Sequence, residues 1–216
     1  MHREFLSHLP STMIGVAFGI ALLWVIQGSL SSSMRESEEL MENLFHFFHA
    51  GHIFLSAITA TVLFYRHTSK KLKTILVVFP ITLVFCGLSD ALIPFVAGAL
   101  LGTKPHLHLC LVEEPLLVLS ANAIGIIVGF LSQKLKKISY FSHGAHVFVA
   151  SVASLSYLIT FGAFGTFNSL WTVATLFLVA TIAVVIPCCS SDIVMPLSFV
   201  GGIHGHEHED EHTHHH

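Results

Sequence analysis

Six long apolar runs follow one another along the chain, with a polar stretch between each run and the next. A helix needs about 20 residues to cross a hydrocarbon core of about 30 Å, and the runs are close to this length or longer. They are continuously apolar, whereas the strands of a membrane barrel alternate between apolar and polar positions. We therefore predict six transmembrane helices, at residues 11–29, 40–65, 74–100, 115–131, 138–161 and 169–187.

The composition supports this interpretation. Hydrophobic residues make up 53% of the 216-residue chain and charged residues only 11%, which is too little polar surface for a soluble domain of this size. The expected class is an all-α integral membrane protein surrounded by a lipid bilayer. No phosphate-binding loop, nucleophile elbow or basic patch is recognisable, so nucleic acid is not an expected partner.

The basic residues predict an orientation. With six spans, both termini share a side with the second and fourth connections, and eight of the ten Lys and Arg residues fall on that side. Because connections rich in basic residues stay in the cytoplasm, we predict that both termini are cytoplasmic. The expected location is a bacterial inner membrane. The opposite face is rich in glutamate, which attracts cations.

Two short motifs occur twice, in the same order. The pattern His-x-x-His-x-Phe occupies residues 49–54 and again residues 143–148. The pattern Cys-x-x-Ser-Asp-x-x-x-Pro occupies residues 86–94 and again residues 188–196. A weaker similarity relates residues 15–23 to residues 121–129. The chain is therefore predicted to consist of two related halves of three helices.

A repeat of three spans places its second copy upside down, so we predict two inverted three-helix repeats. The first repeat covers residues 1–100 and the second covers residues 115–200. An outer loop rich in His, Cys and Glu, residues 101–114, joins them. Residues 201–216, with seven histidines and four acidic residues, are predicted to be a disordered, metal-binding tail.

The repeated polar residues are the candidate site. An ionisable side chain within a span costs about 3 kcal/mol on insertion scales, and it is therefore expected to have a partner or an ion. The two histidines of each pair are three residues apart and project from one helix face. Imidazole and carboxylate together favour a divalent transition metal. The predicted metal ligands are His49, His52, Asp90, His143, His146 and Asp192.

A proline follows each aspartate by four residues and removes the amide that would bond the aspartate carbonyl. We therefore expect the third helix to break near Asp90, close to the end of its apolar run, which would expose carbonyl oxygens to a cation. The alternative interpretation is a proline kink in which Ser89 satisfies the carbonyl and the aspartate caps a helix end.

Further residues could assist the metal. A thiol precedes each aspartate by one turn, Glu42 and His46 extend the first histidine stripe, and the outer loop and the tail add more donors. The possible accessory ligands are Glu42, His46, Cys86, Cys188, His106, His108, Glu113, Glu114, His204, His206 and His208. The spacing in the outer loop matches no closed structural zinc site.

These features favour a secondary transporter, either a permease or an exporter, of a divalent transition-metal cation. Zn²⁺ is the default, with Fe²⁺, Mn²⁺, Co²⁺ and Ni²⁺ as alternatives. Coupling to protons is expected because His and Asp release metal as they bind protons. The three-plus-three layout resembles that of small bacterial cation exporters, an analogy of fold only. A membrane di-metal enzyme acting on lipid, with Glu113 or Glu114 as general base, and a haem-binding electron carrier are the alternatives. A homo-oligomer is left open.

Overall fold

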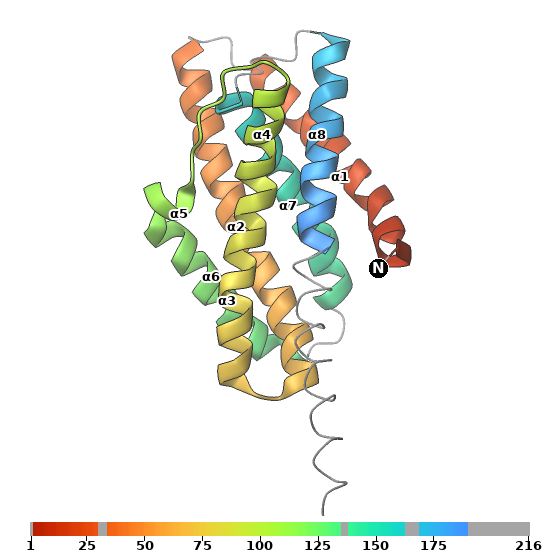
Figure 1. Ribbon diagram of the computed structural model, residues 1–216, viewed down its shortest axis with the longest axis vertical. Coiled ribbons are helices and arrows are strands. Elements are labelled where there is room, and N and C mark those ends of the chain that lie inside the picture. Colours follow the sequence, from red (N-terminus) through yellow and green to blue (C-terminus); the bar gives the residue numbers. More distant parts are fainter. Residues whose placement is uncertain (1, 30–33, 135–137, 163–168, 190–216) are drawn as a thin grey trace, which may run out of the picture.

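The computed structural model describes residues 2–29, 34–134, 138–162 and 169–189, and the regular elements in these ranges are all helical (Figure 1). The longer helices are α1 (His2–Ser29), α2 (Met34–Thr68), α3 (Lys71–Gly87), α4 (Ile93–Leu100), α6 (Pro115–Leu131), α7 (Ile138–Thr160) and α8 (Leu170–Cys189). Short turns are η1 (Leu88–Leu92), α5 (Cys110–Glu113) and η2 (Ser132–Lys134).

All six predicted apolar segments are helical. Four of the helices are long and apolar enough to cross a membrane, at Leu9–Gly28, Glu39–Thr68, Lys71–Leu100 and Leu170–Pro187. The other two, Pro115–Leu131 and Ala145–Thr160, are shorter apolar helices. A helix satisfies its own backbone hydrogen bonds, which is what an apolar run needs in lipid. These lengths and compositions indicate a membrane-associated protein.

The exposed surface is strongly apolar, as expected for a lipid-facing bundle. Large side chains such as Phe18, Trp24, Leu116 and Trp171 are more than 60% exposed. The bundle interior, by contrast, holds small and polar residues: Ala57, Ser151 and many of their neighbours are fully buried. Polar groups therefore gather inside, where protein partners replace water.

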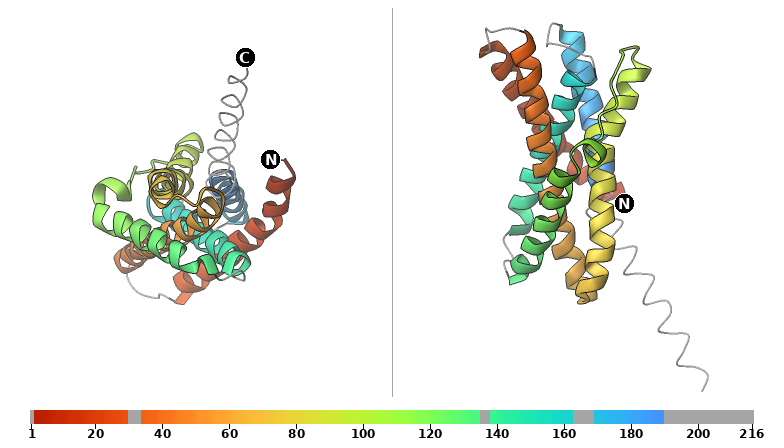
Figure 2. Two further views of the ribbon diagram at one scale, coloured as in Figure 1. Left: turned by 90° about the horizontal axis from the view of Figure 1, so that it is seen from below. Right: turned by 90° about the vertical axis from the view of Figure 1, so that its left-hand side faces the viewer.

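Helices α2 and α7 pack against each other at the centre of the bundle (Figure 2). Helices α3 and α6 pack on α2, while α1 and α8 pack on α7. The α2–α3 turn and η2 lie at one end of the bundle, and the end of α4 lies at the other (Figure 1). The central pair of helices carries both histidine motifs.

Glycines allow α1 and α6 to approach the central helices closely. A Cβ added at Gly125 of α6 would lie 2.6 Å from the Phe54 carbonyl oxygen, and one at Gly129 would lie 2.7 Å from Thr61 Cβ. On the other side of the bundle, a Cβ at Gly15 of α1 would lie 3.3 Å from Ser151 Oγ, and one at Gly19 would lie 2.9 Å from Leu155 Cδ1. Such small residues are typical of helix contacts within membranes.

The expected break near Asp90 is wrong. The helix continues from Lys71 to Leu100, and Asp90 lies within it, in the π-helical turn η1. In this turn the amide of Ile93 donates to the carbonyl of Leu88, five residues earlier. The wider turn lets the helix continue past Pro94, which has no amide hydrogen to donate. A π turn inserted in this way often marks a functional position in a helix.

The connection after α4 is extended rather than helical. Gly102, at a φ of +79°, ends the helix, and the chain runs back along the bundle to α5 (Figure 1). The end of α7 and the residue after it hold this segment: the amide of His106 donates to the Phe161 carbonyl at 2.7 Å, and the Tyr157 hydroxyl forms two hydrogen bonds with the segment's backbone. Extended backbone beside apolar helices needs such partners.

Candidate cation site in the bundle interior

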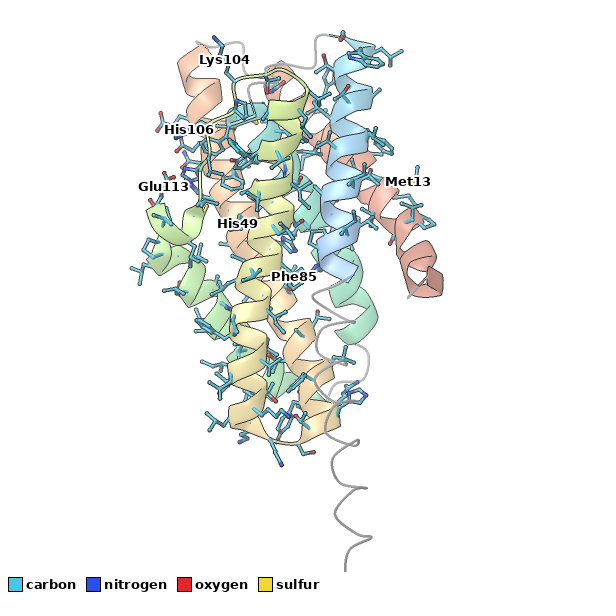
Figure 3. The ribbon with its side chains drawn as sticks, in the orientation of Figure 1. Met13, His49, Phe85, Lys104, His106 and Glu113 are labelled. Atoms are coloured by element: carbon cyan, nitrogen blue, oxygen red, sulfur yellow. The ribbon has the colours of Figure 1, made fainter. Side chains whose placement is uncertain are left out.

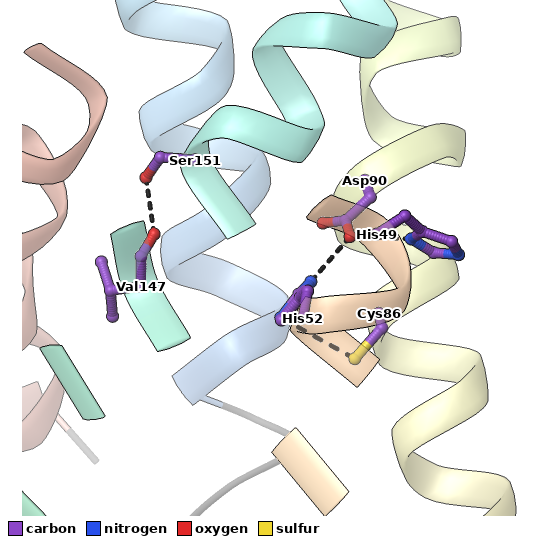
Figure 4. Close-up of polar contacts among 6 residues, drawn as sticks. All are labelled: His49, His52, Cys86, Asp90, Val147 and Ser151. Carbon is purple, nitrogen blue, oxygen red and sulfur yellow. Dashed lines mark hydrogen bonds and ion pairs between the residues drawn. The ribbon is translucent and has the colours of Figure 1, made fainter. Parts of the chain in front are cut away.

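Asp90 is the centre of the candidate site. Its side chain is fully buried, and one of its oxygens, Oδ2, lies 2.8 Å from His49 Nδ1 and 2.7 Å from His52 Nδ1 (Figure 4). The other oxygen, Oδ1, has no hydrogen-bond partner among the described residues. A buried carboxylate with one oxygen left unpaired is costly unless a further cationic or donor group approaches it.

The hydrogen bonds determine which ring nitrogens carry protons. An ionised carboxylate only accepts, so both Nδ1 atoms donate to Asp90 Oδ2. The Nε2 atom of each neutral imidazole is then the nitrogen that can coordinate a metal. A carboxylate that holds Nδ1–H of a ligating histidine is a common arrangement around bound metals.

The predicted residues of the first half lie together. His52 and Asp90 face each other across the contact between α2 and the Lys71–Leu100 helix, and Cys86 Sγ lies 3.7 Å from His52 Nε2. The thiol predicted as an accessory therefore lies beside the central histidine. Phe45 stacks on the ring of His49, with 5.4 Å between centroids, and helps to orient that imidazole.

The second half contributes at least one of its predicted ligands. His146 of α7 is fully buried, and its ring meets that of His52 edge-on, with centroids 4.7 Å apart. Four of the six predicted ligands, His49, His52, Asp90 and His146, thus share one region of the bundle interior. The side chain of His143 and all of Asp192 lie outside the described residues, as does the Cys188 side chain.

The remaining accessory residues divide into two groups. His46 does not join Asp90 but contacts His108, which is held by Glu113. Glu42 is half-buried one turn before His46 on α2, while His106 (Figure 3) and Glu114 are exposed on the connection between α4 and α6. The tail histidines His204, His206 and His208 lie outside the described residues.

The predicted ligand set does not include two residues that the structure brings close to it. Cys110 is buried beside His46 and His108, and Tyr157 anchors the extended connection. Burial raises the pKa of the Cys110 thiol to about 12, and the negative charges of Asp90, Glu113 and Glu114 add to this effect. The sequence nevertheless places Cys110 between His108 and Glu113 in the loop that was predicted to be rich in metal donors.

The cluster can hold positive charge. Its hydrogen-bonded imidazoles and carboxylate are groups that bind either protons or a transition metal, and apolar helices surround them. Comparison of the chain with protein-family models, with curated proteins and with solved structures finds no match.

Proposed function

We propose that this protein is a secondary transporter of a divalent transition-metal cation, with Zn²⁺ as the default substrate. The observation that carries the proposal is the buried Asp90 carboxylate, bonded by two histidines through one oxygen and left unpaired at the other. An ionisable residue in such a position within a membrane bundle marks an ion or proton pathway more often than a structural contact.

Charge balance explains how metal and proton can exchange. With both imidazoles neutral, the His49–Asp90–His52 cluster carries one buried negative charge. A proton on Nε2 of one histidine neutralises this charge, whereas an entering divalent cation leaves one net positive charge. Metal and protons therefore compete for the same Nε2 atoms beside the Asp90 charge, so metal bound from one side is released where protons replace it.

The packing of the bundle supports two related halves. Gly125 approaches Phe54 and Ala57, and Gly15 approaches Phe148 and Ser151. Phe148 and Ser151 of α7 are the repeat equivalents of Phe54 and Ala57 of α2. Each follows its equivalent by the same number of residues as His143 follows His49.

The same holds one turn further along, where Gly129 approaches Ile58 and Thr61 while Gly19 approaches Val152 and Leu155. These contacts pair Gly15 with Gly125. The weak sequence similarity pairs Gly15 with residue 121 instead, so the two alignments differ by four residues. The α1–α7 and α6–α2 contacts are thus equivalent, which favours an inverted repeat.

The contact between His52 and His146 has a particular meaning in this arrangement. These two histidines occupy the same position in the two repeats, and their rings touch. Equivalent residues meet only close to the axis that relates the halves. In inverted-repeat transporters the substrate site lies at this interface, and rocking of one half against the other exposes it to each side in turn.

Flux measurements test the proposal directly. Purified protein is reconstituted into liposomes that contain a metal-sensitive dye and a pH-sensitive dye, and Zn²⁺, Fe²⁺, Mn²⁺, Co²⁺ and Ni²⁺ are added in turn. We expect uptake of at least one metal together with proton movement in the opposite direction. Protein-dependent uptake of none of these metals would overturn the proposal. A Soret band in the purified protein, or metal-dependent turnover of a lipid, would instead favour the haem or enzyme alternative.

A further inference from the structure

A second group of ligand atoms lies outside the Asp90 cluster. One ligand atom from each of His46, His108 and Cys110 lies within 4.8 Å of the other two, and the Nε2 atoms of the two histidines are 2.9 Å apart. His46 comes from α2, His108 from the extended connection and Cys110 from α5. Three donors from separate elements meet at one point only because the connection folds back along the bundle.

The site is already rigid around His108. Glu113 Oε2 accepts from His108 Nδ1–H at 2.8 Å, which places the lone pair of the neutral ring on Nε2, toward His46 and Cys110. Phe161 stacks on the His108 ring with centroids 4.4 Å apart and planes 1° from parallel. The amide of His108 donates to the Tyr157 hydroxyl at 3.2 Å, so the backbone is held as well as the ring.

We propose that His46, His108 and Cys110 form a second metal site, which takes a thiophilic divalent cation such as Zn²⁺ or Co²⁺. Imidazole and thiolate are both ligands that Zn²⁺ takes in proteins, and a water would complete the tetrahedron. Metal entry replaces the hydrogen bond between the histidines: the proton of His46 moves to its Nδ1, and the Cys110 thiol gives its proton to solvent.

The position of this site suggests its use. His46 precedes His49 by about one turn of α2, so the second site lies beside the central cluster but is closer to the exposed outer connection. His46, His108 and Cys110 are half-buried or buried, whereas Glu113 is 45% exposed. A role in loading cations for the central site rests on the proposed transport, whereas the site itself rests only on its own geometry.

Cobalt absorption tests the site, because a thiolate bound to Co²⁺ gives a charge-transfer band in the near ultraviolet that imidazoles and carboxylates do not. The test variant replaces Cys86, Cys188 and Cys189 by serine in the full chain and keeps Cys110. We expect one thiolate-bound Co²⁺ per chain. The histidine-rich tail contains no cysteine, so metal bound there does not contribute to this band.

Added substitutions define the ligands. Cys110→Ser is expected to abolish the band, and His46→Ala or His108→Ala to weaken Co²⁺ binding about 10-fold or more, while the exposed His106→Ala serves as the matched control. Size-exclusion profiles show whether each variant is folded. Absence of the band from the folded variant that keeps Cys110, or a band that survives His46→Ala and His108→Ala unchanged, would overturn the site.

Asp90→Asn separates the two proposals. With the second site intact, this variant keeps the cobalt band and loses flux. A band without flux in the wild-type protein would remove the transport proposal and the loading role but leave the site standing. Flux without the band would overturn the second site and its loading role but leave the transport proposal standing.

Discussion

At the scale of single residues, the most informative feature is how the polar groups of the interior are satisfied. Thr82 and Asn122 form a closed arrangement, in which the Thr82 hydroxyl donates to Asn122 Oδ1 at 2.9 Å and the Asn122 amide donates to the Phe79 carbonyl at 2.9 Å. Asp90 differs, because one of its oxygens has no partner among the described residues. A polar group that only connects two helices is expected to have its hydrogen bonds satisfied, as Thr82 and Asn122 do. A group that binds a ligand is expected to keep an atom available, as Asp90 does.

Asp90→Asn tests this distinction. The amide keeps the shape of the side chain but removes the charge that attracts a cation and fixes the histidine protons. We expect metal flux to fall about 10- to 100-fold, whereas the melting temperature in detergent is unchanged or raised, since burying a neutral group costs less than burying a charge.

The matched control is Thr82→Val. It removes a buried hydrogen bond about two helical turns before Asp90 and is expected to cost about 1 kcal/mol of stability while flux is retained. A Thr82→Val variant that lost flux, or an Asp90→Asn variant that kept it, would contradict this division of roles.

At the scale of elements, close helix contact depends on glycine. Gly125 lies where α6 crosses α2, and any Cβ there meets the backbone of Phe54 rather than a flexible side-chain end. Backbone atoms cannot move aside without moving the helix. The spacing between α6 and α2 therefore depends on the missing methyl group here, as it does one turn later at Gly129.

Gly125→Ala is expected to destabilise the protein by about 1–3 kcal/mol, because overpacking separates the two helices. Thermal unfolding in detergent measures this change. Gly28→Ala is the control, since a Cβ at Gly28 of α1 has no atom within 4 Å, and alanine favours a helix over glycine. The control should be neutral or slightly stabilising, and equal losses from both changes would contradict the packing argument.

At the scale of the whole molecule, the arrangement of the ends agrees with the distribution of charge. The turn that carries Lys70 and Lys71 lies at one end of the bundle, and Lys104 lies near the other (Figure 3). Figure 1 also places η2, which carries Lys134, at the end opposite Lys104. Six membrane crossings would bring the basic second and fourth connections to one side, where basic residues are retained.

Cysteine labelling tests this topology. In a background where the four native cysteines are serines, Lys104→Cys is expected to react with a membrane-impermeant thiol reagent in intact cells. Ser69→Cys, in the turn between α2 and α3, is expected to react only after the cells are permeabilised. Labelling of both positions from the same side would exclude the proposed crossing pattern, whatever the outcome of the flux measurements.

Much of the fold follows from local chemistry that the sequence contains. Each apolar run has to satisfy its own backbone in lipid, and a helix does this without a partner, so the helical segments could be predicted from the pattern of apolar runs. The convergence of His49, His52 and Asp90 was also predictable in outline, because repeated ionisable residues inside spans need partners.

Other features depend on contacts between distant residues and became visible only in the tertiary structure. The π turn at Asp90 keeps continuous a helix that Pro94 was expected to break. The contact between His46 and His108 joins residues 62 positions apart through an extended segment that Tyr157 and Phe161 hold in place. Local pattern cannot specify such pairs, since their energy comes from surfaces that meet only after the helices have packed.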